Sequence, residues 1–470
     1  MKPLAELLRA AGLPPSGEGA VPVGRLICQS DEAQGGDMFV ATVGHRHDGH
    51  GFVQDAYRRG ARVFLCERAV SLPDDAVVIR SENTRKSAAE MLACLYGEPQ
   101  RRMHITAVTG TKGKTTVLHM LRHILERSGE MCAGVGTTGL WLARERTPLL
   151  NTTPDLFVLY PAMARMLAHG CTQLVLEASS QALADGRIDT LPVEVALFTS
   201  FGRDHVGEGE HADEAAYLAA KARLFYDFSP RFTAVNADDP AASRMPRGRM
   251  GGVKCSLRGR GDMCADAVRL FEGGTEYRFG ERTLTLPLYG EPFVMNALLS
   301  AAAASYLTGR GPYECLASLS DVRVPGRSEH FACGGRHIVI DYAHNAMSFF
   351  SVAGVCRRLY GGRLIAVFGS VSGRSYARRE EIAAAADRLF ELSVLTCDRA
   401  GEEPCREICE HMRRFFSHPE NVRFEPSREQ AIRLAFSLSR RGDTLLLLGM
   451  GDEVHADGHT TDRAVAERLL

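Results

Sequence analysis

The residues best suited to chemistry lie in one short stretch, residues 105–116, which reads ITAVTGTKGKTT. An apolar run there predicts a buried strand, a turn with two glycines follows, and apolar residues then recur at helical spacing. In such a strand–loop–helix unit, the loop amides and the helix N-terminus bind phosphate groups. The residues that we expect to bind a nucleotide phosphate chain are Gly110, Thr111, Gly113, Lys114, Thr115 and Thr116.

This loop is a variant of the pattern G-x-x-x-x-G-K-[ST], because Val108 stands where that pattern has its first glycine. The alternative is an ordinary glycine turn between a strand and a helix. Phosphate binding is the better interpretation, because a lysine and two threonines directly after the glycines serve no packing purpose. Lys114 adds a full positive charge, and Thr115 or Thr116 supplies a hydroxyl that can reach a magnesium ion.

Further polar residues follow apolar runs along the chain. Glu177 ends the apolar strand 173–177, where a carboxylate beside a phosphate loop is well placed to hold magnesium; an incidental glutamate before a helix N-cap is the alternative. Residues 213–224 predict a helix, and Lys221, taken alone, reads as a solvated residue on it. Asn296 begins a long alanine-rich helix, either as its N-cap or as a contact to an adenine edge, and the sequence leaves these two even.

Length and composition place the chain among large soluble proteins. Its 470 residues suggest about three domains, with 45% hydrophobic and 24% charged residues. A formal net charge of −1 gives no indication of nucleic acid or an anionic membrane as a partner. Thirteen scattered cysteines without a C-x-x-C pair predict neither a zinc site nor a disulfide framework and fit a reducing cytoplasm. No apolar run reaches about 18 residues, so we expect no membrane span.

Alternating strand and helix patterns predict an α/β protein of three domains. We expect a small N-terminal α/β domain in residues 1–97, a central phosphate-loop domain with a mainly parallel sheet in 98–324, and a Rossmann-like α/β domain in 325–470. The N-terminal domain carries His45, His47, Asp48 and His50 close together. These could form a metal site, but they also suit a polar ligand-binding loop, since no downstream residue completes a metal set.

In this order, the motifs TGTKGKTT, LEASS, RDH, a helical lysine, PGR and DYAHN resemble the Mur ligases over essentially the whole chain. These are three-domain, ATP-dependent, amide-bond-forming enzymes of peptidoglycan synthesis. Several segments are most similar to the UDP-N-acetylmuramoyl-tripeptide synthetase type (the MurE type), including GDMFVATVGHRHDGHGF near the N-terminus. The resemblance implies a cytoplasmic ligase, expected to be a monomer, with ATP, magnesium, a UDP-linked muramoyl dipeptide and an amino acid as its partners.

The resemblance also implies roles for individual residues. Lys114 would hold the β- and γ-phosphates, and Thr115 and Glu177 would bind one magnesium ion. His205 and a carbamylated Lys221 would bind a second ion, so the resemblance reverses the interpretation of Lys221 as a solvated residue. The ATP residues added by the resemblance are Asn296, Arg327, Asp341 and His344. The residues implied for the UDP-linked substrate are Ser30, Gly44, His45, Arg46, Thr152, Thr153, Ser179 and Arg187. The residues implied for the amino-acid acceptor are Asp398, Arg399, Gly449 and Glu453.

Four segments depart from the family pattern. The usual D-S-R reads Gln29-Ser30-Asp31-Glu32, and the usual S-S-H reads Ser179-Ser180-Gln181. The usual D-N-P-R or D-N-P-A reads Asp398-Arg399-Ala400-Gly401 and is one residue shorter, and the usual G-x-G-H-E reads G-M-G-D-E at 449–453. The first keeps its serine and loses its arginine. The residues for chemistry are therefore intact, whereas the amino-acid pocket has changed.

Three functions compete on this sequence. The first is a tripeptide synthetase that adds meso-diaminopimelate or lysine to UDP-MurNAc-L-Ala-D-Glu, which the retained Gly449 and Glu453 favour. The second is a divergent paralogue that joins another amine to another carboxylate, which Gln181 and the altered D-N-P segment favour. The third is a non-catalytic nucleotide-binding scaffold, against which the intact set Lys114, Thr115, Glu177, His205 and Lys221 argues.

Overall fold

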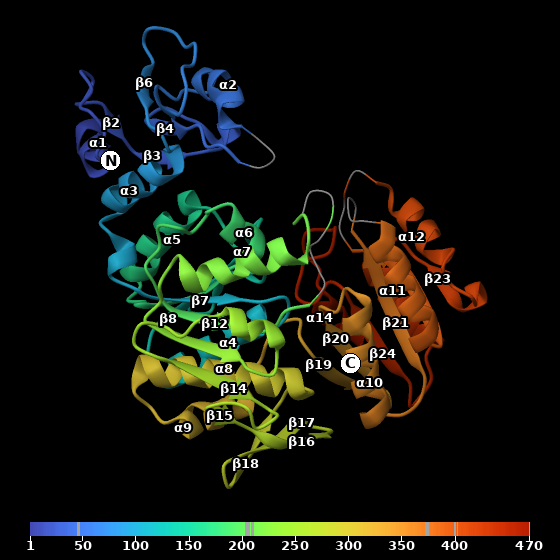
Figure 1. Ribbon diagram of the computed structural model, residues 1–470. Helices are drawn as coiled ribbons and strands as arrows, with labels where there is room; N and C mark the ends of the chain where they lie inside the picture. The colour runs from blue at the N-terminus through green and yellow to red at the C-terminus, as the bar shows by residue number, and fades with distance from the viewer. Residues whose placement is uncertain are drawn as a thin grey trace. The chain divides into compact units, whose positions relative to one another are not determined.

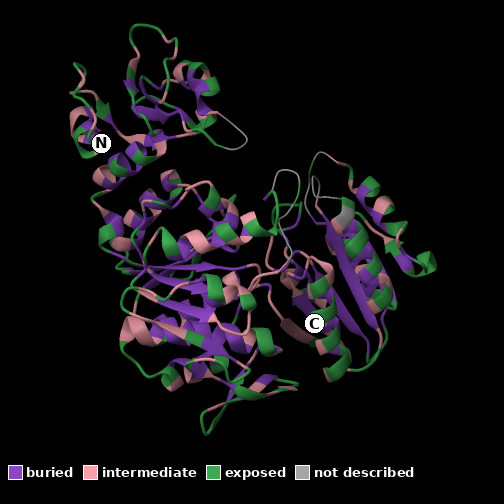
Figure 2. Ribbon diagram, in the orientation of Figure 1, coloured by how far each residue is buried: buried purple, intermediate pink, exposed green. Residues whose placement is uncertain are grey.

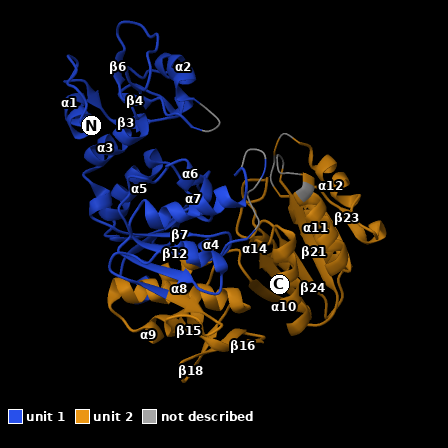
Figure 3. Ribbon diagram, viewed as in Figure 1, with its two compact units in different colours: residues 1–114, 125–253 blue, residues 115–124, 254–470 orange. Residues whose placement is uncertain are grey.

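The computed structural model describes residues 1–44, 48–202, 207, 211–371, 376–398, 401 and 403–469. The chain forms two compact units (Figure 3). The first consists of residues 1–114 and 125–253, and the second of residues 115–124 and 254–470. Among the described residues, no helix is long and apolar enough to cross a membrane.

The first unit begins with a four-stranded parallel sheet in the order β3-β4-β5-β6 (Figure 1). Its side chains alternate between two apolar cores, because successive residues of a strand face opposite sides. On β4, Met38 and Val40 join the core that includes α1 and α3, whereas Phe39 joins the core that includes α2. The elements are β1 (Lys2–Pro3), α1 (Leu4–Ala10), β2 (Pro22–Val23), β3 (Arg25–Ile27), β4 (Asp37–Val40), α2 (Val53–Arg58), β5 (Val63–Cys66), β6 (Val77–Arg80) and α3 (Thr84–Tyr96).

The central sheet has nine strands in the order β10-β9-β8-β11-β7-β12-β13-β14-β15. Strand β7 lies between β11 and β12, and both pairs are parallel, so the carboxyl ends of these three strands meet at one edge. In register, Val108 of β7 pairs with Glu177 on one side and Leu197 on the other. The strands are β7 (His104–Thr109), β8 (Cys132–Gly136), β9 (Gly139–Leu142), β10 (Glu145–Thr147), β11 (Gln173–Glu177), β12 (Val193–Phe198), β13 (Phe232–Asn236), β14 (Gly252–Ser256) and β15 (Met263–Cys264).

Helices and a small sheet complete the central region. The segment expected to contain hairpin-like strands forms a three-stranded antiparallel sheet, β16-β17-β18, within the second unit. The strands of the central sheet are largely buried, and the small sheet is more exposed (Figure 2). The elements are α4 (Lys114–Arg127), α5 (Leu156–Ala168), α6 (Ser180–Ala184), α7 (Glu214–Tyr226), β16 (Asp266–Phe271), β17 (Gly274–Phe279), β18 (Arg282–Leu286), α8 (Glu291–Thr308) and α9 (Pro312–Ala317).

The C-terminal sheet has six strands in the order β19-β20-β24-β21-β22-β23, and only the β19–β20 pair is antiparallel. Helices α10, α11 and α12 share one apolar core with it, and α13 and α14 share a second core on the opposite face. The elements are β19 (Glu329–Cys333), β20 (Arg336–Asp341), α10 (Ala346–Leu359), β21 (Leu364–Ser370), α11 (Tyr376–Leu389), β22 (Leu392–Cys397), α12 (Cys405–Arg413), β23 (Val422–Phe424), α13 (Arg428–Leu438), β24 (Thr444–Leu448) and α14 (Asp462–Leu469). The expected α/β class with mainly parallel sheets is confirmed.

One cysteine pair corrects the expectation of thiols alone. Cys397, the last residue of β22, and Cys405, the first residue of α12, form a disulfide with a Cα–Cα distance of 5.6 Å. The bond therefore spans the connection in which the family's acceptor motif is altered. Cysteine spacing could not reveal it, because it is the fold that brings the end of β22 close to the start of α12, eight positions later in the sequence.

Candidate active site

The phosphate loop connects β7 to α4 and is held by its own backbone. The Lys114 ammonium donates to the carbonyl oxygens of Gly110 at 2.8 Å and Thr111 at 3.3 Å, so the lysine folds back over the loop. The segment after β12 supports the loop, because the Thr111 amide donates to the Ser200 carbonyl at 2.7 Å and the Thr199 hydroxyl donates to the Lys112 carbonyl at 2.5 Å. The two supporting residues were not among the predicted site residues.

Glu177 ends β11 with a fully buried carboxylate. Its oxygens accept hydrogen bonds from the Thr137 amide at 2.9 Å and the Thr137 hydroxyl at 3.2 Å. Within the described part of the chain, no lysine or arginine pairs with it, and a buried carboxylate without a positive partner is costly. Oxygen ligands of this kind suit Mg²⁺. A divalent cation therefore fits this donor.

Gly136 explains how Glu177 is accommodated. A Cβ atom at this glycine would lie 2.1 Å from the Glu177 Oε1 atom, so any side chain there would displace the carboxylate. The glycine at the end of β8 therefore determines where the carboxylate at the end of β11 can lie. This dependence is invisible in the sequence, because the two residues are far apart along the chain.

Lys221 is buried, so its isolated interpretation as a solvated residue is wrong. The side chain is 1% exposed, and its ammonium donates to the Gly110 carbonyl at 3.1 Å. The same ammonium lies 4.1 Å from the centroid of the Tyr217 ring, one turn earlier on α7. The Tyr217 hydroxyl is 3.2 Å from that of Thr111, so α7 contacts the phosphate loop through two side chains. The predicted metal ligand His205 lies outside the described residues.

The residues predicted for the muramoyl-peptide end lie together around the carboxyl end of β11. The buried Thr153 hydroxyl donates to the Glu177 carbonyl at 2.7 Å and accepts from the Ser179 amide at 3.0 Å. Arg187 donates to the Thr153 carbonyl at 3.4 Å, and the Thr152 hydroxyl lies 3.1 Å from that of Thr137. Ser179 also caps α6, since its hydroxyl accepts from the amide of the third helical residue. The structure thus brings these four predicted residues together.

In the N-terminal domain, the possible metal ligand His50 is engaged by the protein itself. Its Nε2 accepts from the Glu67 amide at 2.9 Å, so the ring proton is on Nδ1, which donates to the Asp48 carboxylate at 2.6 Å. Hydrogen bonds from the backbone amide and the ring of His50 lower the pKa of Asp48 to about 2. No metal-type cluster occurs among the described residues, and His45, Arg46 and His47 lie outside them. Ser30 and Gly44 are described, in a 3-10 turn and a loop.

In the second unit, the predicted ATP residues occupy different positions. Asn296 is buried inside α8, whose N-cap is Gly290, so the N-cap alternative for Asn296 is excluded. Asp341 lines a small pocket that also includes Tyr289 and Phe293. Its carboxylate accepts from the amides of residues 328 and 343, both at 2.9 Å. Thr115 and Thr116, the next residues of α4 after Lys114, also belong to the second unit and are buried.

Arg327, His344 and Glu453 all contact Tyr342, which lies in the stretch 341–344 predicted to surround ATP but was given no role of its own. The Arg327 guanidinium lies 4.2 Å from the centroid of the Tyr342 ring, and the His344 ring lies edge-on at 5.0 Å. The Tyr342 hydroxyl donates to Glu453 Oε1 at 2.9 Å. A signal did exist, since Tyr342 lies inside the DYAHN motif between two of the selected residues.

The predicted acceptor residue Asp398 is engaged in a buried ionic cluster. Its carboxylate accepts from Arg428 at 3.0 Å, and the same guanidinium donates to Asp462 at 2.7 and 3.0 Å and to the Leu448 carbonyl at 2.9 Å. Although burial raises the pKa of Asp462, the charge of Arg428 and a hydrogen bond from His455 lower it below its usual value overall. Gly449 directly follows the strand that Arg428 contacts, whereas Arg399 lies outside the described residues.

Three family models match successive parts of the chain. "Mur ligase family, catalytic domain" matches residues 25–99, "Mur ligase middle domain" residues 108–304, and "Mur ligase, glutamate ligase domain" residues 326–451. The UDP-N-acetylmuramoyl-L-alanyl-D-glutamate–2,6-diaminopimelate ligase of Aquifex aeolicus is 31% identical over 433 residues, which cover 90% of this chain and 88% of the relative. The enzyme of the same name from Chlorobium phaeobacteroides is 31% identical over 482 residues, covering 97% and 93%.

Solved structures agree on the fold. A UDP-N-acetylmuramoyl-L-alanyl-D-glutamate–2,6-diaminopimelate ligase matches with a TM-score of 0.68 and 23% identity over 99% of this chain and 98% of its own. The MurF ligase of Thermotoga maritima, solved in complex with ADP, matches with a TM-score of 0.59 and 20% identity over 95% and 96%. With the sequence matches, these findings confirm the resemblance drawn from the motifs: the chain belongs to the Mur ligase family.

Proposed function

We propose that this protein is an ATP-dependent ligase that adds a diamino acid, meso-diaminopimelate or lysine, to UDP-MurNAc-L-Ala-D-Glu in peptidoglycan precursor synthesis. The observation that carries the proposal is the arrangement in the first unit, where Lys114 and the buried Lys221 both donate to the Gly110 carbonyl of the phosphate loop. The names of the relatives favour 2,6-diaminopimelate as the amino acid.

The chemistry of this proposal follows from charge. The substrate carboxylate attacks the γ-phosphorus of ATP, the bond to the bridging oxygen breaks, and ADP leaves. Lys114 and the loop amides neutralise the negative charge that builds on the phosphoryl oxygens. The amine of the incoming amino acid then attacks the acyl carbon, loses a proton, and expels inorganic phosphate as the amide forms. Closure around the site would protect the acyl phosphate from water.

Magnesium fits the buried carboxylate of Glu177. This residue, buried without a cationic partner in the described residues, would hold one ion, with Thr115 as the hydroxyl ligand expected from the sequence. Bound Mg²⁺ would neutralise phosphate charge during transfer. Carbamylation would convert the Lys221 ammonium into an anionic oxygen donor for a second ion, with His205. The burial of this lysine and its contact with the phosphate loop support that role.

The remaining assignments extend the proposal to the other ligands. Asn296, Arg327, Asp341 and His344 would bind ATP; Ser30, Gly44, His45, Arg46, Thr152, Thr153, Ser179 and Arg187 would bind the UDP-linked substrate; and Asp398, Arg399, Gly449 and Glu453 would surround the acceptor. We propose a monomer that acts in the cytoplasm, where ATP is available.

A specific observation favours a second candidate, a paralogue with a different acceptor. The acceptor motif is altered at residues 398–401, and the Asp398 carboxylate is already bound by buried Arg428. A pocket whose polar groups have changed leaves different atoms of a substrate unpaired and so selects a different substrate.

The test is phosphate release from ATP in the presence of UDP-MurNAc-L-Ala-D-Glu and a panel of amino acids. We expect one diamino acid to stimulate release and the tripeptide product to appear by mass spectrometry. If no amino acid stimulates a protein that still binds ATP, the carboxylate substrate is a different compound and the paralogue is correct.

A further inference from the structure

Tyr342 contacts two segments that are far apart in the sequence and that carry different predicted ligands. Its ring lies beneath the guanidinium of Arg327, 4.2 Å from Cζ to the ring centroid, and its hydroxyl donates to Glu453 Oε1 at 2.9 Å. Arg327 is assigned to ATP, and Glu453 to the acceptor amino acid. All three side chains are half-buried, and all three belong to the second unit. One residue thus joins the two ends of the proposed site.

Both contacts involve a charged group. A guanidinium over an aromatic face is attracted by the partial negative charge of the ring surface. A hydrogen bond from a hydroxyl to a carboxylate is stronger than one between two neutral groups. Among the residues that the structure describes, Arg327 forms no ion pair, and the hydrogen bond of its guanidinium goes to the Gly326 carbonyl at 3.3 Å. The position of its guanidinium therefore depends mainly on the Tyr342 ring.

The backbone around Tyr342 makes this link stiff. The Tyr342 amide donates to the Gly326 carbonyl at 3.0 Å, which ties the end of β20 to the turn that carries Arg327. Gly326 has a φ of +67°, and a Cβ atom there would lie 2.2 Å from the Asp452 nitrogen, directly before Glu453. The two segments are therefore in close backbone contact, and the tyrosine side chain lies against both. Neither segment can shift without changing a Tyr342 contact.

We propose that Tyr342 is a positioning residue that couples nucleotide binding to acceptor binding. Its ring orients Arg327 for the phosphate groups, and its hydroxyl orients Glu453 for the amino acid. The identity of the two ligands rests on the proposed function, whereas the coupling rests on the geometry alone. By linkage, the acceptor must then raise the affinity for the nucleotide by the same factor as the nucleotide raises the affinity for the acceptor.

A double-mutant cycle tests the coupling without any acceptor. The dissociation constant of a non-hydrolysable ATP analogue with Mg²⁺ is measured for the wild type, Glu453→Gln, Tyr342→Phe and the double variant. Although Glu453 is assigned to the acceptor, we expect the single variant Glu453→Gln to bind the analogue about 5-fold more weakly than the wild type. In the Tyr342→Phe background we expect no further change, because the hydroxyl that transmits the effect is gone. Independent, multiplying effects, or no effect of Glu453→Gln, would overturn the proposal.

Steady-state kinetics then separates the two contacts of the tyrosine. Tyr342→Phe keeps the ring and removes the hydroxyl, so we expect a higher KM for the acceptor, by about 10-fold, and a smaller rise in the KM for ATP, about the 5-fold effect of Glu453→Gln. Tyr342→Leu removes the ring as well and is expected to raise both. Equal effects of the two variants on the KM for ATP would contradict the role of the ring.

Tyr313 provides the matched control. It is a half-buried tyrosine of the same unit, and the Arg282 guanidinium lies 4.1 Å from its ring centroid. Neither residue is among the predicted site residues. Tyr313→Phe is expected to change neither KM. If no amino acid stimulates even the wild type, the proposed function fails, while the nucleotide cycle still decides the role of Tyr342.

Discussion

The proposed phosphate-binding region of the first unit and the proposed acceptor region of the second are each stabilised by a different kind of internal contact. In the first, the important side chains bond to backbone groups: Lys114 and Lys221 to the Gly110 carbonyl, and Glu177 to the Thr137 amide. In the second, Asp398 is fixed by a buried guanidinium, Arg428. A site built on backbone groups requires a short, continuous motif. A site built on side-chain pairs depends on residues scattered along the chain.

The two regions also differ in charge balance. Glu177 is buried without a cationic partner in the described residues, so its charge is available for an incoming metal ion. The Asp398 charge is instead compensated by Arg428, which also pairs with Asp462. A carboxylate at the end of a parallel strand can therefore serve either ligand binding or internal support. Its partners decide which.

The largest effect is expected at Lys221, the residue that we propose as a metal ligand in the phosphate-binding region. Lys221→Ala should reduce phosphate release about 1000-fold, because a cation at a transferring phosphoryl group supplies several kcal/mol. Lys221→Arg keeps the positive charge and cannot form a carbamate, so it should be equally inactive. Phosphate release with added bicarbonate, together with carbon-13 NMR of the labelled carbamate, measures both points. Wild-type activity in Lys221→Arg would rule out the carbamate.

The ionic cluster of the acceptor region should control stability. Asp462→Asn is expected to lower the free energy of unfolding by about 3–5 kcal/mol at pH 7, because it leaves buried Arg428 only partly paired. The folded-state pKa of Asp462 lies below the usual 3.8, so the wild type gains this stability above that pH and loses it as the pH falls through the folded-state pKa. The variant should lack this acid-dependent loss.

Urea denaturation at pH 7 and at acidic pH measures the effect. Glu467→Gln serves as the control, since it removes an exposed partner of Arg463 one turn away on α14 and should cost less than about 0.5 kcal/mol. If Asp462→Asn is no less stable than Glu467→Gln, the cluster does not support the region.

Close packing in the phosphate-binding region predicts the next effect. Gly136→Ala places a Cβ atom 2.1 Å from Glu177 Oε1 and should displace the carboxylate, which costs about 100-fold in activity. The apparent magnesium requirement should rise at the same time. Gly17→Ala is the control, because a Cβ atom there meets no heavy atom within 4 Å. Unchanged magnesium dependence in Gly136→Ala would show that Glu177 is not a metal ligand.

The smallest effect is expected from the disulfide. Replacing Cys397 and Cys405 by serine should lower the free energy of unfolding by about 2 kcal/mol, because the closed loop is short, with a sequence separation of eight. The KM for the acceptor should rise and that for ATP should not. Cys264→Ser, at a free thiol, is the control for both measurements. A higher KM for ATP in the double serine variant would contradict the separation of the two regions.

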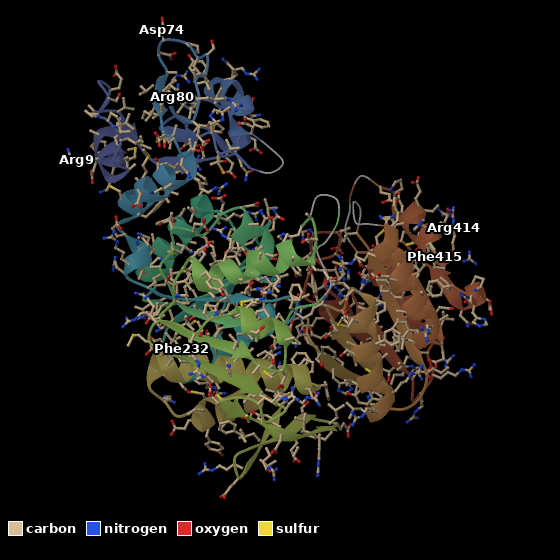
Figure 4. The ribbon with its side chains drawn as sticks, viewed as in Figure 1. Arg9, Asp74, Arg80, Phe232, Arg414 and Phe415 are labelled. Atoms are coloured by element: carbon tan, nitrogen blue, oxygen red, sulfur yellow. A yellow bond between two sulfur atoms is a disulfide. The ribbon has the colours of Figure 1, made fainter. Side chains whose placement is uncertain are left out.

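The sequence predicted features that rest on contiguous motifs and missed those that rest on contacts between distant residues. The phosphate loop, the α/β class and the strand end at Glu177 were predicted, because each rests on contiguous residues. The burial of Lys221 was not visible in a helix of small residues, and the Arg428–Asp462 pair joins residues 34 positions apart. Helix ends also shifted: the helix expected at 213–224 extends from Glu214 to Tyr226. Exposed charges such as Arg9, Asp74 and Arg414, which lie at the surface in Figure 4, were not singled out and contribute nothing to the described site.

The disulfide also has a consequence for engineering. Cys397 closes a strand and Cys405 opens a helix, so the connection between them is attached to the scaffold at two covalently joined points. Part of this connection could be exchanged as a cassette, but Glu403 should be kept, because its carboxylate pairs with the buried guanidinium of Arg379. Libraries confined to residues 399–402, next to the proposed acceptor residue Asp398, are therefore the place to search for ligases that accept new amines.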